Sequence, residues 1–115
     1  MIPTEFGIID NFDPAKDYDD YEPEKYHCVA IDDDLYINDW WEKLQMMKTY
    51  FFRLDRPEFG LNRWGITLIP PESLPVLQDI IITDKRINED EHLVALAQKV
   101  QQAIDEKKYM IHYGV

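Results

Sequence analysis

The sequence is short of the residues on which many functions depend. Its 115 residues include one cysteine (Cys28), one serine (Ser73) and four glycines. A single cysteine excludes an internal disulfide. The glycines are scattered and form no phosphate-binding loop, so nucleotide binding has no support in the sequence. Ser73 lacks the glycines of a nucleophile elbow, and we expect it to cap a helix instead.

Long apolar runs are also absent. No stretch approaches the ~18 consecutive apolar residues of a membrane span, and the first ten residues contain no basic segment followed by an apolar run. With 45% hydrophobic residues, the chain can nevertheless bury a core without disulfides or structural metals. We therefore expect a soluble, cytoplasmic protein, made of one compact domain over residues 1–115 and not associated with membranes.

Basic residues are scarce in the first third of the chain. Residues 1–39 contain 12 acidic residues against Lys16 and Lys25, whereas the remainder contains 11 acidic and 10 basic residues. The formal net charge of the whole chain is −11. A negative field of this size repels nucleic-acid phosphates and attracts positively charged proteins. The charge pattern therefore argues against nucleic-acid binding and favours a basic protein partner.

Residues 10–24, here called the acidic loop, mix acidic residues with two prolines and three aromatic residues, Phe12, Tyr18 and Tyr21. Apolar residues in this segment follow neither the period of a strand nor that of a helix, which predicts a loop. Disordered tails are normally poor in aromatic residues. We therefore expect the acidic loop to pack either on its own domain or on a partner.

The remaining apolar patterns predict an α+β fold, with a small sheet of about three or more strands covered by two or three helices. Runs rich in β-branched and aromatic residues predict three strands, at residues 26–31, 63–69 and 109–113. Helical spacing of apolar residues predicts three helices, at about residues 40–50, 73–82 and 89–108. The expected N-terminal caps of these helices are Asp39, Ser73 and Asn88.

The consecutive residues Asp32, Asp33 and Asp34 permit two interpretations. Carboxylates at the end of a strand can bind a divalent cation, and Asp32, Asp34 and Asp39 would be the ligands of such a site. The spacing does not fit an EF-hand loop, because Lys43 stands where the bidentate glutamate belongs. Aspartates are also the ordinary residues of turns and helix caps. We favour a solvated turn before a helix, and we expect neither a metal nor a cofactor.

Two other groups of residues resemble parts of functional sites. His27 and Cys28 could belong to a nucleophilic site, but neighbouring side chains on a strand point to opposite faces and cannot form a dyad. The basic and aromatic segment around Arg63 and Trp64 could bind an anionic ligand. Because large aromatic side chains are mostly buried, we expect its aromatics to pack in the core and its bases to offset the acidic residues. No catalytic residue is therefore predicted.

We interpret the sequence as a small acidic, non-enzymatic module that binds a basic protein. One concrete form is an immunity-type protein that neutralises a bacterial toxin domain, because blocking a basic active site requires dense negative charge and no chemistry. The alternatives are the metal-dependent module or enzyme described above and a structural subunit that assembles with copies of itself. The residues expected to contact the partner are Asp17, Tyr18, Asp19, Asp20, Tyr21, Asp32, Asp33, Asp34 and at least one of Trp40 and Trp41.

Overall fold

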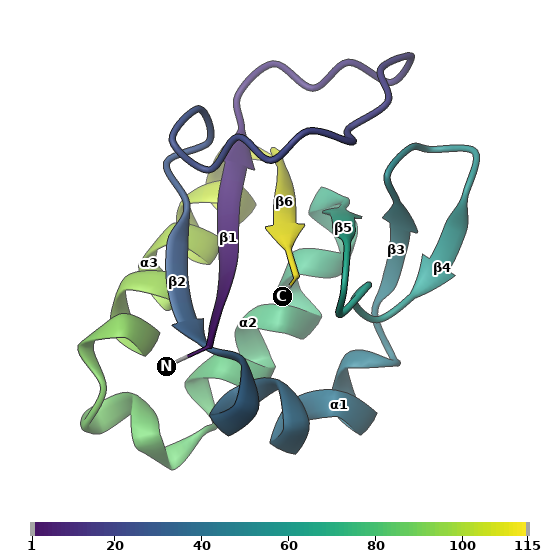
Figure 1. Ribbon diagram of the computed structural model, residues 1–115. Helices are drawn as coiled ribbons and strands as arrows, with labels where there is room; N and C mark the ends of the chain where they lie inside the picture. Colours follow the sequence, from purple (N-terminus) through teal and green to yellow (C-terminus); the bar gives the residue numbers. More distant parts are fainter. Residues whose placement is uncertain (1, 115) are drawn as a thin grey trace.

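A six-stranded antiparallel sheet forms the centre of the computed structural model, which describes residues 2–114 (Figure 1). The strand order is β2-β1-β6-β5-β3-β4. Helices pack on one side of the sheet, and none of those within residues 2–114 has both the length and the apolar character needed to cross a membrane. The strands are β1 (Pro3–Ile9), β2 (Val29–Asp32), β3 (Lys48–Phe51), β4 (Pro57–Phe59), β5 (Ile66–Ile69) and β6 (Tyr109–Tyr113). The helices are α1 (Asn38–Leu44), α2 (Leu74–Ile82) and α3 (Glu91–Glu106), and the shorter helical turns are η1 (Asp33–Ile37), η2 (Pro71–Ser73) and η3 (Lys85–Asn88).

The expected α+β class is confirmed, and the sheet is larger than the minimum of about three strands that we expected. Strand β6 occupies the predicted residues 109–113, and α2 and α3 lie within the predicted helices. Strand β1 was not predicted, although it pairs with both β2 and β6. Its Gly7 interrupts the apolar run and is required by packing, because a Cβ there would lie 2.6 Å from the sulfur of Cys28.

The helix expected over residues 40–50 is wrong in its second half. Helix α1 ends at Leu44, and Lys48–Phe51 form strand β3 instead. Leu44 and Met47 fit a helical stripe, and both are buried in the core. From Met47 to Thr49, however, side chains alternate between buried and exposed, which is the pattern of a strand. The helical spacing therefore continued by coincidence across the end of the helix.

Two of the three expected helix caps are wrong, and Ser73 stands at the N-cap of α2 without its side chain capping the helix. Asp90, not Asn88, caps α3 by accepting a hydrogen bond from the backbone N–H of His92 at 2.9 Å. The hydroxyl of Ser73 donates to the carbonyl oxygen of Lys48 at 2.6 Å and so joins α2 to β3. Asp39 pairs with a distant arginine rather than with the start of α1. Tertiary contacts thus use two of the three side chains that local sequence assigned to capping.

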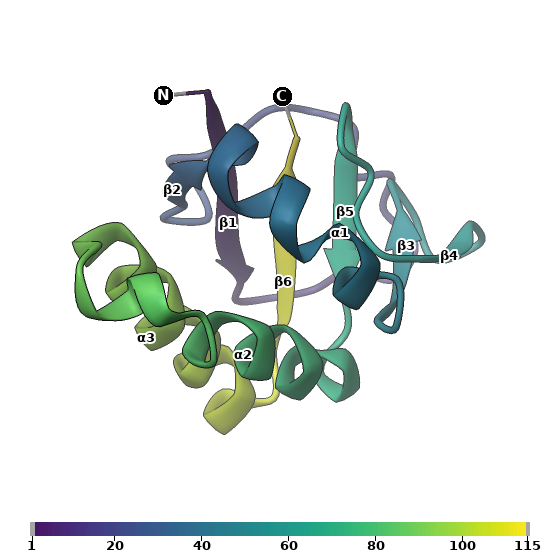
Figure 2. The ribbon, with the colours of Figure 1, turned by 90° about the horizontal axis from the view of Figure 1, so that it is seen from below.

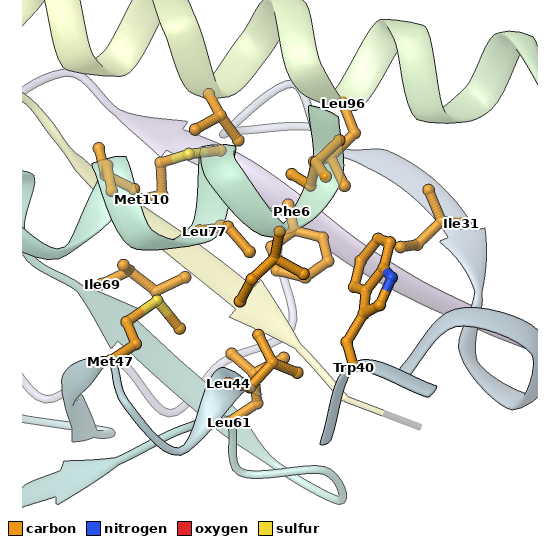
Figure 3. Packing of buried hydrophobic residues seen from close by; sticks show 14 of the residues in the cluster. Phe6, Ile31, Trp40, Leu44, Met47, Leu61, Ile69, Leu77, Leu96 and Met110 are labelled. Atoms are coloured by element: carbon orange, nitrogen blue, oxygen red, sulfur yellow. The ribbon is translucent and has the colours of Figure 1, made fainter. Parts of the chain in front are cut away.

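The main hydrophobic core lies between the sheet and the helices. Figure 3 shows Phe6 of β1, Met110 of β6 and Leu77 of α2 pointing into it, together with the indole of Trp40 from α1. Leu96 closes this core from α3. Seen from below in Figure 2, η1 and α1 cross the lower end of the sheet while α2 and α3 lie along one face. Each helix therefore buries one apolar stripe against the same sheet.

A second apolar cluster lies on the opposite face of the sheet. Strand β6 contributes to both clusters, because Met110 faces the helices whereas Ile111 and Tyr113 face the other way. Its remaining members come from neighbouring strands and from the segment before β2: Ile9, Tyr18, Tyr26, Ile66 and Leu68. Tyr18 belongs to the acidic loop, so this loop takes the place of a second helical layer.

A buried polar contact joins the three central strands. The ring of His112 on β6 lies between Thr4 of β1, 2.6 Å from its Nε2, and Thr67 of β5, 3.2 Å from its Nδ1. All three residues are buried. Burial lowers the pKa of His112 to about 3, so the ring is neutral in the folded protein at physiological pH.

Replacing His112 by glutamine tests this burial. The unfolded chain takes up a proton on His112 below a pKa near 6.5, whereas the folded protein does so only near 3. Stability from the neutral ring is therefore present above pH 6.5 and is lost as the pH falls below it, at a limiting slope of about 1.4 kcal/mol per pH unit. We expect the difference in unfolding free energy between the wild type and His112→Gln to narrow or reverse between about pH 7 and pH 4. Urea unfolding measures it, and a constant difference would contradict a neutral buried ring.

Candidate functional site

The residues expected to contact a partner belong to two separate segments, the acidic loop and the stretch from Asp32 in β2 to Trp41 in α1. Strand β1 begins at Pro3, which pairs with Asp32, and ends at Ile9, immediately before the acidic loop. The loop then folds back over the sheet, because the backbone N–H of Tyr18 donates to Phe52 and the hydroxyl of Tyr21 donates to Glu5 of β1. Figure 1 shows the acidic loop above the sheet, and η1 and α1 below it. The structure therefore presents two separate surfaces rather than one.

Aromatic stacking holds the acidic loop against the sheet. The ring of Phe12 stacks on Tyr109 of β6, with ring centroids 3.8 Å apart, and on Tyr18, with centroids 5.3 Å apart. Tyr21 packs edge-on against Tyr113. Of the two alternatives for this loop, packing on its own domain is the one observed. Tyr18 is buried by this packing, so its ring is not available to a partner.

Hydrogen bonds fix the backbone of the same loop. The N–H of Tyr18 donates to the carbonyl oxygen of Phe52 at 2.8 Å, and the Tyr18 hydroxyl accepts from the N–H of Asp13 at 2.9 Å. Further along, the N–H of Glu22 donates to the hydroxyl of Tyr113 at 3.1 Å. The segment is thus anchored at intervals by buried tyrosines, and its shape does not have to be imposed by a partner.

The carboxylates of the acidic loop point away from this packing. Asp17, Asp19 and Asp20 are exposed. Asp17 lies 3.9 Å from the guanidinium of Arg53, whereas Asp19 and Asp20 take part in none of the salt bridges found among residues 2–114. Tyr21 is 64% exposed beside them, and its hydroxyl donates to the carboxylate of Glu5, which raises its pKa to about 12.

Asp33 is buried at the lower end of the sheet, next to Arg63. Its Oδ2 accepts from the Nε of Arg63 at 3.1 Å and from its NH2 at 2.8 Å. Its Oδ1 has no hydrogen-bond partner among the described residues. Asp33 is therefore not available to a partner, although Asp32 is partly exposed and Asp34 is exposed. The pair ties η1 to the turn between β4 and β5.

Two tryptophans flank the same arginine. The guanidinium carbon of Arg63 lies 5.7 Å from the ring centroid of Trp41 and 5.7 Å from that of Trp64. Trp41 is partly buried, whereas Trp64 is 75% exposed. The expectation that the aromatic residues of this segment pack in the core is therefore wrong for Trp64. Arg63 does offset negative charge from residues 1–39, through the single buried carboxylate of Asp33.

Trp40 has a structural role. Its indole is buried in the core and its Nε1–H donates to Asp84 at 2.8 Å. Arg86 contacts Asp84 at 2.6 Å, which holds the pKa of the Asp84 carboxyl well below its usual range, and it also contacts Asp39 at 3.0 Å. Tyr36 donates to Asp90 at 2.5 Å beside the same arginine. These contacts fasten α1 to η3, and η1 to the start of α3.

The aspartates at residues 32–39 do not converge. Asp32 accepts a hydrogen bond from the backbone N–H of Leu35, while Asp33 pairs with Arg63 and Asp39 with Arg86. Within residues 2–114 there is no group of three or more histidine, cysteine or acidic side chains arranged to hold a metal ion. Cys28 is partly buried, and burial raises the pKa of its thiol to about 12, which keeps it protonated.

The chain was also compared with known proteins. No family model, curated protein or solved structure matches it. The candidate surfaces therefore have to be judged from their own geometry and charge.

Replacing Arg63 by methionine tests the buried ion pair. The variant leaves the Asp33 carboxylate buried without its counter-charge, so we expect the unfolding free energy to fall by about 3 kcal/mol or more. Adding Asp33→Asn removes the unpaired charge and should recover much of the loss. Arg53→Met, in an exposed ion pair, should cost at most about 1 kcal/mol. Urea unfolding compares them, and equal effects at Arg63 and Arg53 would contradict a structural role for the buried pair.

Metal addition tests the remaining interpretation of the aspartates. We expect calcium or magnesium to leave the melting temperature unchanged, because these carboxylates do not converge. A site saturated at 100 times its dissociation constant would add about 2.7 kcal/mol, which is several degrees for a domain of this size. A shift of that kind, abolished by Asp34→Asn but not by Glu89→Gln at the exposed residue after η3, would overturn the prediction.

Proposed function

We propose that the protein is a non-enzymatic binding protein that captures a positively charged protein through the acidic loop. The observation that carries the proposal is that two kinds of residue in this loop have different roles. Its aromatic side chains Phe12 and Tyr18 anchor it to the sheet, while Asp17, Asp19 and Asp20 stay exposed. A surface of this kind offers concentrated negative charge in a fixed shape.

The fixed shape supports binding because it lowers the entropy lost on association. A disordered acidic segment would have to be ordered at the moment of binding, which weakens the complex. Here the contacts of Tyr18 with Phe52 and Asp13, and of Glu22 with Tyr113, already order the backbone. The loop can therefore meet a partner with little reorganisation.

Charge and apolar area would contribute to different steps of binding. Exposed carboxylates attract a basic protein over distance, and so act mainly on the association rate. Asp19 and Asp20 are best placed for this, because no salt bridge within residues 2–114 neutralises them. Tyr21, 64% exposed, supplies apolar area whose removal would act mainly on dissociation.

A concrete form of this function is an immunity-type protein that neutralises a toxin domain. A domain that acts on nucleic acid needs a basic active site, and a rigid acidic surface can occlude such a site without any chemistry. The net charge of −11 and the small size of the chain support this form. The partner is thus expected to be a basic protein whose active site faces the acidic loop.

Removing the unpaired carboxylates tests the proposal. The wild type and an Asp19→Asn/Asp20→Asn variant are used to capture proteins from a cell lysate at low salt. The association and dissociation rates of both are then measured with the proteins recovered. We expect basic partners, an association rate that falls by about tenfold in the variant, and a similar fall on raising the salt concentration. Tyr21→Ser should instead raise the dissociation rate.

The control removes the same number of charges elsewhere. Glu58→Gln/Glu89→Gln changes two exposed carboxylates on β4 and after η3, outside the acidic loop, and should leave the association rate nearly unchanged. If the captured proteins are not basic, or if they associate equally fast with the loop variant, the acidic loop is only a solubilising face.

A further inference from the structure

Helix α2 is apolar on nearly every side. Of its nine residues, only Gln78 and Asp79 are polar. A surface helix normally has a polar face opposite its apolar stripe, whereas a helix that is apolar all round is typical of one that is covered on all sides. The inner side of α2 is covered, because Leu77 and Ile81 are buried in the main core and Gln78 donates to the carbonyl oxygen of Ala97 on α3 at 2.9 Å. The outer side faces water.

The outer side of α2 borders an apolar groove. Pro75, Asp79 and Ile82 follow one another at helical spacing and are exposed, Ile82 to 52%. Beside them, a groove of about 500 Å³ separates α2 from the end of α1. Its lining consists of Lys43, Met46, Pro75, Val76, Asp79 and Ile80. We call this feature the α2 groove.

Met46 stands in water at the edge of the α2 groove. It is 77% exposed, although its backbone is held in a turn. The N–H of Met46 donates to the carbonyl oxygen of Lys43 at 3.2 Å, and the carbonyl oxygen of the buried Met47 accepts from the N–H of Gly60 at 2.8 Å. An unbranched, adaptable thioether side chain is suited to filling an apolar gap. The fixed turn therefore presents Met46 as an apolar anchor next to a groove of matching character.

The α2 groove carries one charge of each sign. Lys43 belongs to α1 and Asp79 to α2, and neither takes part in a salt bridge among the residues described. When a patch faces a copy of itself across a two-fold axis, two different residues of the patch meet each other twice. Lys43 and Asp79 can therefore form two ion pairs between two copies of this chain. A uniformly basic partner would instead oppose Lys43 with like charge.

The net charge of −11 is concentrated away from the α2 groove. Residues 40–115, which supply every residue of its lining, contain 11 acidic and 10 basic residues, a net charge of −1. The acidic loop packs on the opposite face of the sheet, since Tyr18 belongs to the second apolar cluster and Leu77 to the main core. At physiological ionic strength, screening weakens repulsion between charges that lie this far apart.

We propose that the α2 groove is the contact of a homodimer, in which Met46 of each copy enters the groove of the other and Lys43 pairs with Asp79 in both directions. This contact does not depend on the function proposed for the acidic loop. It leaves both acidic loops uncovered, because they lie on the far face of each sheet. The dimer thus offers two acidic surfaces in one assembly.

Sedimentation velocity over a range of protein concentrations measures the proposed association. We expect the wild type to convert from monomer to dimer as its concentration rises. Met46→Ser should weaken dimerisation by about tenfold or more, because the apolar contact is lost twice in each dimer. Leu35→Ser removes another apolar side chain, 48% exposed on η1 and outside the groove, and should leave the dissociation constant unchanged.

Charge reversal tests the geometry of the contact. Lys43→Glu places an acid opposite Asp79, and Asp79→Lys places a base opposite Lys43, so each variant alone should dimerise at least about tenfold more weakly than the wild type. An equimolar mixture of the two variants should recover the dimer, since each copy then meets opposite charges at both positions. Both residues are exposed, so both variants should unfold at the same urea concentration as the wild-type monomer.

Several results would overturn the homodimer. A wild type that stays monomeric at every concentration excludes it. A dimer that Leu35→Ser weakens as much as Met46→Ser uses another face. If the mixture of charge variants does not recover the dimer, the contact is not two-fold symmetric and the proposal fails. If the wild type is monomeric and a captured protein loses affinity with Met46→Ser, a different protein occupies the groove. The Asp19→Asn/Asp20→Asn variant should still dimerise, which separates this test from that of the acidic loop.

Discussion

The sheet has apolar side chains on both faces, and both faces must be shielded from water. Met110 and Ile111 are neighbours on β6, yet they enter different hydrophobic clusters. The helices shield only one of these clusters. The other is covered by residues 10–24, which contribute Phe12 and Tyr18 rather than a helix. The order of the acidic loop is therefore a consequence of the burial of β6, because loosening the loop would expose the second cluster.

This arrangement also explains how a strongly acidic segment can lie close to a folded core. Carboxylates cannot be buried cheaply without partners, whereas aromatic rings gain free energy when they leave water. The acidic loop places the two kinds of residue on opposite sides. Asp33 is the most deeply buried acidic residue among those described, and it is accommodated because Arg63 lies at 2.8 Å. Charge thus stays at the surface except where specific pairs, Asp33 with Arg63 and Asp84 with Arg86, join parts of the fold.

Some of this structure could be predicted from the sequence, and the limits have physical causes. Helices α2 and α3 carry amphipathic patterns of their own, and strand β6 alternates Tyr109, Ile111 and Tyr113, so their positions were predicted well. The end of α1 was predicted wrongly, because Met47 fits both the apolar stripe of a helix and the alternating pattern of a strand. Two tryptophans adjacent on a helix point about 100° apart. One of them was therefore expected at the surface, and Trp41 is the one that remains partly exposed.

The candidate surfaces were harder to predict than the elements. Asp33 and Arg63 are 30 positions apart, and no local signal distinguishes Asp33 from the aspartates on either side of it. Tyr18 and Tyr21 are equally aromatic in sequence, but only the first is buried, because the register of the acidic loop on the sheet decides which ring faces inward. Trp64, in contrast to Tyr18, is exposed, because Asn62 and Gly114 hold its turn in a position that leaves the ring outside.

The two ends of the described chain meet beside this turn. The carbonyl of Ile2 accepts a hydrogen bond from Asp33, and Gly114 is bonded to Gly65. Any domain or affinity tag joined to either end therefore emerges beside this turn. Because Tyr113, next to Gly114, contacts both Tyr21 and Glu22, such a fusion also comes close to the acidic loop. A bulky fusion would act as a steric shield over part of that loop, so the size of the tag decides how much of its surface an interaction screen can sample.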